Sequence, residues 1–587
     1  MEILSEFIAA ALREPRERAF AERRGAPEWT FTSSTRMLDR AGAIARALRA
    51  AGAVPGDRVA LISNNRVDWL AADFGILFAG CVSVPVFATL ALDQLEYIFR
   101  DCDAKLAFVE GAADAERVRA ACPGAPRLIH FDGSGPDSLA EFERLGASLA
   151  SPASTGPAEQ AGPDDLAVLI YTSGTTGNPK GVMLSHRNLI SNTLAATELL
   201  PDDFKRGGEA VLSVLPFAHV FEHTDVLGFL RYRAELYITQ PDYLLNDLKS
   251  ARPRMMALVP RIFERVLAGI VGKAKAEGGL KARLVPWALG VGRDYMAAAT
   301  SGHAPGGMPA LQYAIAQRLV LSKIKPMVGL DRLEFFISGS APLHRDIALT
   351  FAGIGVPICE GYGLTETSPV VTVNPPGNIR YGSVGKPIAG VEIKLAPDGE
   401  ILVKGPNVML GYYHLPGERP FTDEGWFQTG DIGELDADGY LYITDRKKEL
   451  IKTSAGKYVA PGRVEAALKR SIYIGQCFVI GDGRPFPVAL VCPNFEALRV
   501  EFQIAAEVPN VLVAARADVR DFMQKEVTDK TADLASFEQV RRVALLPRDL
   551  TIEDGELSPT LKVKRRVVEK KFADLIDSAY AGSPSAA

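Results

Sequence analysis

The stretch that decides the fold is LAVLIYTSGTTGNPKGV (166–182), in which an apolar run leads into a turn rich in glycine and threonine. The run LAVLIY predicts a strand buried on both faces, as in parallel sheets. Six small residues then precede Lys180, and they are Thr172, Ser173, Gly174, Thr175, Thr176 and Gly177. Glycines expose backbone N–H groups, hydroxyls add donors and the lysine adds positive charge. The pattern predicts a cradle for a polyphosphate, and the alternative is a flexible surface turn.

On the N-terminal side of this stretch, the first 150 residues alternate helical and strand patterns, which favours α/β layers with a largely parallel sheet. Residues 151–165 form a Pro/Ser/Gly/Ala-rich linker or surface loop. On the C-terminal side, α/β alternation continues to about residue 370. From residue 380, strands punctuated by Asp-Gly indicate β-hairpins, and a mixed α/β segment follows Asp445.

Composition excludes several classes of protein. With 587 residues, 47% hydrophobic and 23% charged, the chain is neither disordered nor a small disulfide scaffold. A net charge of −5 offers no broad basic face for nucleic acid. Six scattered cysteines without a C-x-x-C fit a reduced cytosol. Trp69 to Leu92 is long enough to span a bilayer, but Gly75, Gly80 and Pro85 favour a buried helix followed by a strand.

Three further clusters carry chemistry. In EGYGLTETSP (360–369), Tyr362 offers an aromatic face for a base and Glu366 a hard oxygen ligand for Mg²⁺. Asp431 and the Asp445-Arg446 pair suit ribose hydroxyls, as carboxylates do in dinucleotide folds. Near the C-terminus, LSPTLKVKRRVVEKKF is strongly basic. Taken alone, the first cluster also fits a turn with one exposed acid, and the second fits a hairpin-turn aspartate. The third also fits the solvent-exposed face of a helix.

In this order and at these separations, the four clusters resemble the core motifs of the adenylate-forming acyl/aryl-CoA ligase superfamily, which includes luciferases and peptide-synthetase adenylation domains. The resemblance covers roughly residues 30–575. Within the superfamily, the sequence is most similar to long-chain fatty acyl-CoA synthetases. That closer similarity rests on PFAHVFEH (216–223), VPRIFERV (259–266), FFISGSAPL (335–343), EGYGLTETSPV (360–370), YGSVGKP (381–387) and SPTLKVKRR (558–566).

The resemblance implies a fold and a reaction. Residues 1–444 would form a large domain of layered α/β subdomains with a β-rich portion, and residues 445–587 a small mobile α+β domain. A fatty acid carboxylate would attack the α-phosphate of ATP to give an acyl-adenylate and pyrophosphate. The thiol of coenzyme A would then displace AMP. Mg²⁺ would assist as the metal ion, and positioning and electrostatics would dominate catalysis.

The resemblance also implies roles for individual residues. The Thr172–Lys180 loop would hold the β- and γ-phosphates, and Thr175 and Glu366 would ligate Mg²⁺. The adenine would be framed by Gly339, Ser340, Ala341, Gly361, Tyr362 and Gly363, next to Thr365, and the ribose held by Asp431 and Arg446. Lys562 falls at the position of the mobile catalytic lysine. Lys448 occupies the hinge position, and Gly456 falls on the loop beside the coenzyme A channel. His219 matches a position near the substrate carboxylate, although His219 would also fit as a histidine of the core.

Alternative functions stay open at this point. One is an acyl-AMP ligase that loads a carrier protein, which the absence of a carrier domain after Lys562 disfavours; another is a medium-chain or aryl-acid CoA ligase. A decayed, non-catalytic site conflicts with the intact Lys180, Glu366, Asp431 and Lys562. We expect a cytoplasmic enzyme without nucleic-acid partners, in peripheral contact with the inner membrane face to collect lipid. The oligomeric state is open, with a homodimer as one option.

Overall fold

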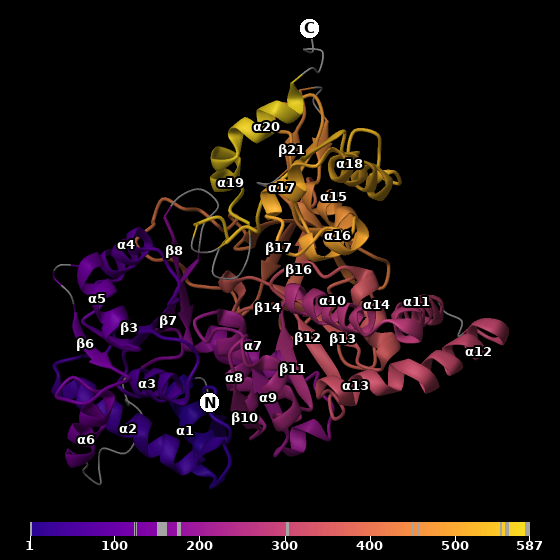
Figure 1. Cartoon of the computed structure of the whole chain (residues 1–587). Coiled ribbons are helices and arrows are strands. Elements are labelled where there is room, and N and C mark those ends of the chain that lie inside the picture. The colour runs from indigo at the N-terminus through magenta and orange to yellow at the C-terminus, as the bar shows by residue number, and fades with distance from the viewer. Residues whose placement is uncertain are drawn as a thin grey trace. The chain divides into compact units, whose positions relative to one another are not determined.

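Figure 1 shows the computed structural model of the chain. The structure describes residues 3–122, 124, 126–149, 161–172, 178–300, 305–447, 450–454, 457–551, 554–557 and 563–581. Contacts divide the chain into two compact units. The first comprises Met1–Lys394, Leu402–Gln428 and Leu435–Tyr442, and the second comprises Leu395–Ile401, Thr429–Glu434 and Ile443–Ala587.

The predicted strand at 166–171 lies in the interior of a sheet with the order β18–β8–β7–β4–β3–β5–β6. The strands are β3 (Arg58–Ile62), β4 (Val82–Val86), β5 (Leu106–Val109), β6 (Arg127–His130), β7 (Leu166–Thr172), β8 (Lys180–Ser185) and β18 (Gly411–Tyr412). From β6 to β7 the neighbours pair in parallel, whereas β7–β8 and β8–β18 are antiparallel. The expected α/β layers with a largely parallel sheet are confirmed in this region.

Helices precede the first of these strands and connect the parallel ones along the chain. They are α1 (Leu4–Arg13), α2 (Ser34–Ala50), α3 (Val67–Phe78), α4 (Leu92–Cys102), α5 (Ala112–Ala121) and α6 (Leu139–Ser148). Helix α2 begins where the Ser33 side chain accepts a hydrogen bond from the Arg36 N–H, and it ends before Gly52, whose φ of 91° favours glycine. The apolar run from Trp69 to Leu92 is the predicted buried helix followed by a strand, namely α3 and β4. Among the described residues, none of the helices combines the length and apolar content that a bilayer span requires.

A second sheet of the first unit has the order β15–β14–β13–β12–β11–β9–β10–β1–β2. Its strands are β1 (Phe20–Glu22), β2 (Thr30–Thr32), β9 (Ala210–Ser213), β10 (Glu235–Ile238), β11 (Met255–Leu258), β12 (Phe335–Ser338), β13 (Ile358–Gly363), β14 (Val370–Val373) and β15 (Lys386–Pro387). Pairing is parallel from β1 through β10, β9, β11 and β12 to β13. Strands β14 and β15 continue antiparallel.

The helices of this second half are α7 (His186–Thr197), α8 (Val220–Arg231), α9 (Leu244–Ala251), α10 (Pro260–Glu277), α11 (Gly279–Ala299), α12 (Gly307–Ala316), α13 (Ser322–Val328) and α14 (Arg345–Ile354). Short helical turns are η1 (Phe204–Arg206), η2 (Gln317–Leu321) and η3 (Thr365–Thr367). Helix α7 begins with a reciprocal capping box between Ser185 and Asn188 directly after β8. Strand and helix therefore follow each other without a loop.

The predicted β-rich texture after residue 380 corresponds to a sheet with the order β16–β17–β19–β20. The strands are β16 (Glu392–Leu395), β17 (Glu400–Lys404), β19 (Phe427–Leu435) and β20 (Leu441–Arg446), and β21 (Ile451–Lys452) pairs separately with β22 (Tyr458–Val459). Turns with Gly399 and Gly439 at positive φ join consecutive strands, as the Asp-Gly signals predict.

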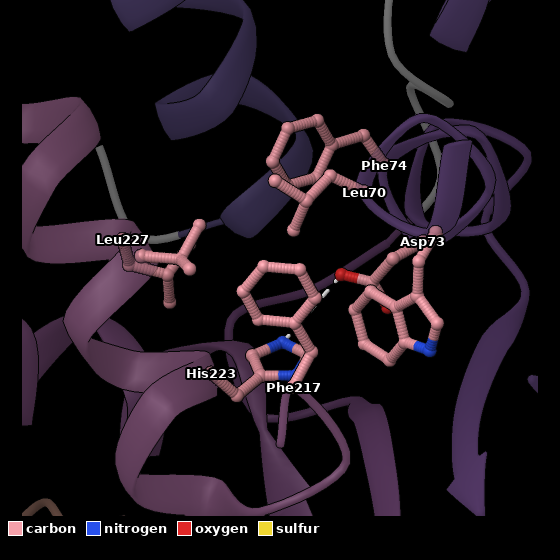
Figure 2. Close-up of a pocket in the computed structure, with 8 residues that line it drawn as sticks. Leu70, Asp73, Phe74, Phe217, His223 and Leu227 are labelled. Atoms are coloured by element: carbon pink, nitrogen blue, oxygen red, sulfur yellow. Dashed lines mark ion pairs between the residues drawn. The ribbon is translucent and has the colours of Figure 1, made fainter. Parts of the chain in front are cut away.

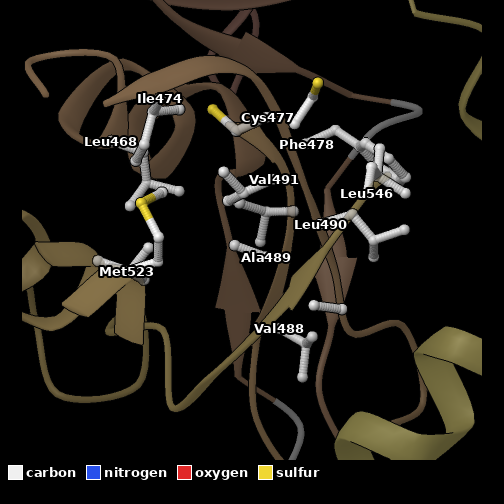
Figure 3. Packing of buried hydrophobic residues seen from close by; sticks show 14 of the residues in the cluster. Leu468, Ile474, Cys477, Phe478, Val488, Ala489, Leu490, Val491, Met523 and Leu546 are labelled. Atoms are coloured by element: carbon white, nitrogen blue, oxygen red, sulfur yellow. The ribbon is translucent and has the colours of Figure 1, made fainter. Parts of the chain in front are cut away.

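The C-terminal part of the second unit has its own apolar core (Figure 3). A sheet of β23 (Ile474–Ile480), β24 (Val488–Pro493) and β25 (Arg542–Leu545) is accompanied by α15 (Pro461–Leu468), α16 (Phe495–Glu501), α17 (Asn510–Ala515), α18 (Ala517–Thr531), α19 (Arg565–Lys571) and α20 (Ala573–Tyr580). Phe478, Leu490 and Met523 are fully buried in this core. The predicted β23–β24 hairpin is present. None of the six cysteines, all of which the structure describes, forms a disulfide.

Candidate functional site

The polyphosphate cradle predicted at 172–180 sits on the hairpin of β7 and β8. Thr172, the last residue of β7, is paired across the hairpin with Lys180, the first residue of β8, and the Thr172 hydroxyl donates to the Lys180 carbonyl at 3.5 Å. Ser173, Gly174, Thr175, Thr176 and Gly177 lie outside the described residues. The antiparallel pairing thus brings both ends of the predicted cradle together.

The Lys180 ammonium lies between a carboxylate and an aromatic ring. Its Nζ is 2.5 Å from Oε1 of Glu418 and 5.0 Å from the centroid of the Tyr412 ring. Tyr412 reaches this position because β18 pairs with β8, where it stands opposite Val182. Both contacts are attractive to a cation.

Glu366 lies on the other side of Tyr412. The Tyr412 hydroxyl donates to Oε1 of Glu366 at 2.8 Å, and the Met409 N–H donates to the Glu366 carbonyl at 2.9 Å. Burial and the neighbouring Glu366 carboxylate both raise the pKa of Tyr412, so its phenol keeps the proton it donates. Tyr412 therefore links the two predicted phosphate-site residues, Lys180 at the start of β8 and Glu366 in the turn η3.

Two asparagine side chains hold the turn that carries Glu366. Both Asn192 and Asn407 donate their amide NH₂ groups to the carbonyls of Thr367 and Val370, at 2.7–3.3 Å. The turn contains Ser368 at φ 68°, a conformation that non-glycine residues adopt rarely. We infer from this network that Glu366 is held in place by hydrogen bonds from α7 and from the segment before β18, which offset the local strain.

The residues predicted to frame adenine follow two neighbouring parallel strands. Gly339, Ser340 and Ala341 come directly after β12, whereas Gly361, Tyr362 and Gly363 close β13. Ser338 pairs with Glu360, so both segments start at the same edge of the sheet. Ligands of open α/β sheets bind at the carboxyl ends of strands, as predicted here.

Close packing explains two of these glycines. A Cβ on Gly363 would stand 1.7 Å from the Pro369 carbonyl oxygen, and a Cβ on Gly339 would stand 3.2 Å from the Phe221 ring. The first position admits no side chain without a backbone shift, and the second admits one only if Phe221 moves. Thr365 begins the turn η3 that holds Glu366.

A buried carboxyl group, Glu360, stands at the base of this segment. Its side chain is buried, and burial raises the pKa of Glu360 to about 8. A hydrogen bond from the Gly382 N–H acts in the opposite direction but is the smaller effect. Because the folded-state pKa lies above the unfolded value of about 4.3, the contribution of this group to stability is fully present below the unfolded value, decreases as pH rises between the two values, and is lost above about 8. Glu360 is therefore neutral near pH 7.

His219 caps helix α8. Its Nδ1 accepts a hydrogen bond from the Phe221 N–H at 3.2 Å, and its ring is 6.5 Å from the Phe87 ring. The imidazole is half-buried. Phe221, whose N–H bonds to His219, has its ring 3.2 Å from the place a Cβ on Gly339 would take, so His219 lies near the predicted adenine frame.

One turn along α8, His223 forms a buried polar pair that sequence reasoning missed. Its Nε2 is 3.6 Å from Oδ2 of Asp73, and Asp73 also accepts a hydrogen bond from Ser83 at 2.6 Å. Figure 2 shows this pair at the wall of a small pocket lined by apolar side chains, including Phe74 and Phe217. Burial raises the pKa of Asp73, while His223 and Ser83 oppose that effect. The pair ties α8, which His219 begins, to α3 and β4.

In the second unit, the structure brings together the two predicted ribose-binding residues. Nε of Arg446 is 2.9 Å from Oδ1 of Asp431, whose side chain is only 4% exposed. Thr429 donates its hydroxyl to the Ile401 carbonyl and accepts from the Asp431 N–H, which holds the backbone before the carboxylate. Asp431 stands inside strand β19, so the alternative of a hairpin-turn aspartate is wrong.

Lys448, Gly456 and Lys562 lie outside the described residues, but the segment around Lys562 is bounded by defined contacts. Leu557 and Val563 form an antiparallel bridge, and the Lys564 N–H donates to the Glu556 carbonyl at 2.8 Å. The Glu556 carboxylate is fully buried.

Three groups converge on the Glu556 carboxylate. The Arg548 guanidinium donates to both of its oxygens, at 2.7 and 2.8 Å, the Lys571 ammonium is 2.8 Å away, and the Thr551 N–H donates at 3.1 Å. Burial opposes ionisation of Glu556, but these contacts outweigh it and lower its pKa to about 2. We call Glu556, Arg548 and Lys571 the Glu556 clamp.

The donor set around Glu366 fits Mg²⁺ only together with a phosphate ligand. In the described part of the chain, no group of three or more His, Cys, Asp or Glu side chains could hold a metal ion. Mg²⁺ is typically bound by one or two carboxylates plus substrate phosphates and water, and Glu366 offers one such carboxylate beside the cradle.

Tyr412, Glu418, Asn192 and Asn407 are the residues that sequence reasoning missed at this site. The pair Tyr412–Glu366 spans 46 positions, and the longest of the asparagine contacts spans 178. Separations of this size carry no local periodicity. The signal that was available is the polar and aromatic run GPNVMLGYYH (405–414) between predicted strands.

Comparison with known proteins agrees with this geometry. Residues 7–413 match the AMP-binding enzyme family, and residues 448–584 match the AMP-binding enzyme C-terminal domain. The chain therefore belongs to the AMP-binding enzyme family, which confirms the superfamily predicted from the motifs.

Named relatives and solved structures extend this result. The chain is 35% identical over 561 residues to long-chain-fatty-acid–CoA ligase FadD15 of Mycobacterium bovis, covering 94% of this chain and 92% of the relative. It is 30% identical over 571 residues to human long-chain-fatty-acid–CoA ligase 1, covering 90% and 78%. ATP-bound MatB from Rhodopseudomonas palustris superimposes with a TM-score of 0.70 at 26% identity, over 97% and 99% of the two chains. The A domain of a carboxylic acid reductase from Segniliparus rugosus, at 22% identity, shares the fold with a TM-score of 0.78, over 99% and 94%.

Proposed function

We propose that this protein is an AMP-forming long-chain fatty acid–CoA ligase. The observation that carries the proposal is the link from Lys180 through Tyr412 to Glu366 beside the β7–β8 hairpin. Relatives named long-chain-fatty-acid–CoA ligase, each matched over most of this chain, support the substrate class. Carrier-protein loading and aryl or medium-chain acids have no comparable support among these relatives.

In the first half-reaction, the fatty acid carboxylate oxygen bonds to the α-phosphorus of ATP and the bond to the β-phosphate oxygen breaks. Pyrophosphate leaves and the acyl-adenylate remains. Lys180 and the 172–177 loop hold the β- and γ-phosphates, and Lys180 exchanges its contact with Glu418 for the phosphate. Because both reactants are anions, the main task of the protein is to offset their repulsion.

Other groups position the nucleotide and the acid. The segments Gly339–Ala341 and Gly361–Gly363 frame the adenine, Asp431 and Arg446 hold the ribose, and His219 lies near the acid carboxylate. Glu366, with Thr175, would ligate Mg²⁺, which when bound would neutralise phosphate charge. Glu366 is oriented for this by Tyr412 and by the hydrogen-bonded turn beneath it.

In the second half-reaction, the thiol sulfur of coenzyme A bonds to the acyl carbonyl carbon, AMP leaves with the electron pair, and the thiol proton passes to solvent. We propose that residues 1–444 bind ATP and the acid and that residues 445–587 form a mobile domain. That domain would turn about Lys448, bring Lys562 to the first half-reaction, and place Gly456 beside the coenzyme A channel in the second. We further propose a cytoplasmic enzyme in peripheral contact with the inner membrane face.

The test measures the two half-reactions separately. In Lys562→Ala, acid-dependent pyrophosphate release should fall by about a hundredfold or more, while thioester formation from supplied acyl-adenylate is retained. Lys564→Ala is the matched control and should keep both rates. Wild-type pyrophosphate release by Lys562→Ala would contradict the assigned role.

The substrate class is tested with ATP, Mg²⁺, coenzyme A and acids from acetate to stearate. Each buried CH₂ contributes about 0.8 kcal/mol, so kcat/KM should rise with chain length toward the long acids. A maximum at short or aromatic acids would overturn the long-chain assignment.

A further inference from the structure

A continuous helical segment of the first unit, formed by α12, the π-helical turn η2 and α13, has one face anchored in the core. Ala316, Leu321 and Ile324 of this segment are buried in a cluster with Ile270, Leu289 and other apolar residues of α10, α11 and α14. The anchoring determines which side chains of the segment face away from the protein.

Polar contacts reinforce this orientation. Tyr313 donates its hydroxyl to the Gly353 carbonyl at 3.2 Å, Gln317 donates its amide to the same carbonyl at 2.8 Å, and the Tyr313 ring stacks on Tyr295 at 4.1 Å. The segment is therefore fixed against α11 and α14 and cannot turn its outer face inward without breaking these bonds.

The outer face is also apolar. Met308, Leu311, Ile315 and Leu319 recur at helical spacing and are 65, 55, 42 and 48% exposed. We call these four residues the apolar stripe. Spacings of three and four residues place them on one side of the helix. A surface helix ordinarily carries polar residues there, so within the described part of the chain the stripe is an exposed apolar face.

The charged residues of this segment have one sign. Arg318 and Lys323 are exposed, three residues after Ile315 and four after Leu319 respectively, so they flank the stripe. Between Asp294 and Asp331 the sequence has no acidic residue, although the whole chain has a net charge of −5. An apolar helical face with basic flanks complements a surface that offers acyl chains below negative headgroups.

We propose that the apolar stripe, with Arg318 and Lys323, docks the enzyme on an anionic lipid bilayer. The helix would lie in the plane of the interface, with the stripe among the acyl chains and the two cations at the headgroups. A single-residue-wide aliphatic stripe lacks the aromatic anchors and the buried area that a stable protein interface uses. The proposal rests on the proposed function insofar as long-chain acids reside in membranes.

The experiment is flotation of the full-length protein with vesicles of phosphatidylcholine and phosphatidylglycerol in equal parts, compared with phosphatidylcholine alone. We expect binding to the anionic vesicles, weakened by salt. The double variant Leu311→Ser and Ile315→Ser should lose about tenfold in partition coefficient, because each partly buried aliphatic side chain contributes to insertion. Arg318→Gln with Lys323→Gln should lose about fivefold per charge on anionic vesicles only.

The matched control is Val54→Ser with Leu512→Ser, two apolar residues that are 57 and 56% exposed elsewhere on the chain. This control should bind vesicles as the wild type does. Equal binding by the stripe variant and the wild type overturns the proposal, as does a dimer in sedimentation velocity that the stripe variant dissociates. Circular dichroism of each variant checks that it is folded.

The same preparations separate this inference from the proposed function. Acyl-CoA formation from a dissolved acid, without vesicles, should be unchanged in the stripe variant because the stripe is not part of the site. Acyl-CoA formation without vesicle binding refutes docking and leaves the function standing. Vesicle binding without acyl-CoA formation from any acid refutes the function and leaves docking standing.

Discussion

Lys180 and Glu556 each stand in an ion pair, but their surroundings give these pairs different properties. Lys180 pairs with Glu418, whose side chain is 44% exposed, so replacing that carboxylate by another anion, such as the phosphate of the proposed site, should cost little. The Glu556 carboxylate is fully buried and receives Arg548, Lys571 and a backbone N–H together. Removing a partner there leaves a buried charge, which is strongly unfavourable. Solvent exposure therefore distinguishes an ion pair whose partner can be exchanged from an ion pair that stabilises the folded state.

Two regions are compared: the exchangeable region, which comprises Lys180, Glu418, Tyr412 and Glu366, and the fixed region, which is the Glu556 clamp. The largest effect on the exchangeable region should come from Glu366→Gln. The amide keeps a hydrogen bond from Tyr412 but loses the negative charge that would bind Mg²⁺, so pyrophosphate release should fall by about 10²–10³-fold. The measurement is the ATP–pyrophosphate exchange rate against Mg²⁺ concentration. Glu392→Gln, an exposed acid of β16, is the control. An unchanged rate would show that Glu366 is not at the reacting phosphates.

Glu556→Gln tests the fixed region. The amide is a neutral acceptor, so the charge-assisted hydrogen bonds from Arg548 and Lys571 are lost, at a cost of about 3 kcal/mol locally. Hydrogen exchange of the Lys564 amide, which bonds to the Glu556 carbonyl, should accelerate by about a hundredfold. Glu496→Gln, exposed in the same unit, should change nothing.

The same clamp has a predicted pH dependence. Because the folded-state pKa of Glu556 is about 2, below the unfolded value of about 4.3, its contribution is present above the unfolded value and is lost as pH falls toward 2. Protection of Lys564 in the wild type should therefore decrease across this window, and the variant should show no such decrease. Equal slopes for both proteins would contradict the clamp.

Tyr412→Phe should have a smaller effect on the exchangeable region. The ring that faces Lys180 remains, while the hydrogen bond to Glu366 is lost, at a cost of about 1.5 kcal/mol for a bond to a charged group. We expect kcat for adenylate formation to fall about tenfold, with the KM for ATP little changed. A change in KM alone would assign Tyr412 to nucleotide binding instead.

The smallest effect should come from Glu418→Gln. Because the competing carboxylate is removed, Lys180 is more available to phosphate, and the KM for ATP should fall about two- to fivefold. The difference from the wild type should shrink as salt is added. A rise in KM would show that Glu418 assists ATP binding, which would reverse our interpretation of the exposed pair.

Much of the site could be predicted from local sequence. Short motifs contain the predicted site residues Thr172, Lys180, Glu366 and Asp431, and the residue types of these motifs indicate phosphate, metal and ribose binding. Buried strands precede the motifs that contain Thr172, Lys180 and Glu366. Strand β7 and helix α3 were predictable because their apolar patterns are long and bounded by glycine. Tyr412, Asn192 and the Glu556 clamp were not predictable, because each acts through a partner that only the fold brings near.

By itself, the sequence determined the α/β class and the family, and it predicted the residues proposed to carry the chemistry, since these depend on residue type and on spacing along the chain. Tertiary structure alone decided that Tyr412 joins Lys180 to Glu366, that Glu360 is buried and neutral, and that the apolar stripe faces outward. Distances between side chains, and the loss of water around a charge, depend on which segments pack together. No local pattern encodes that packing.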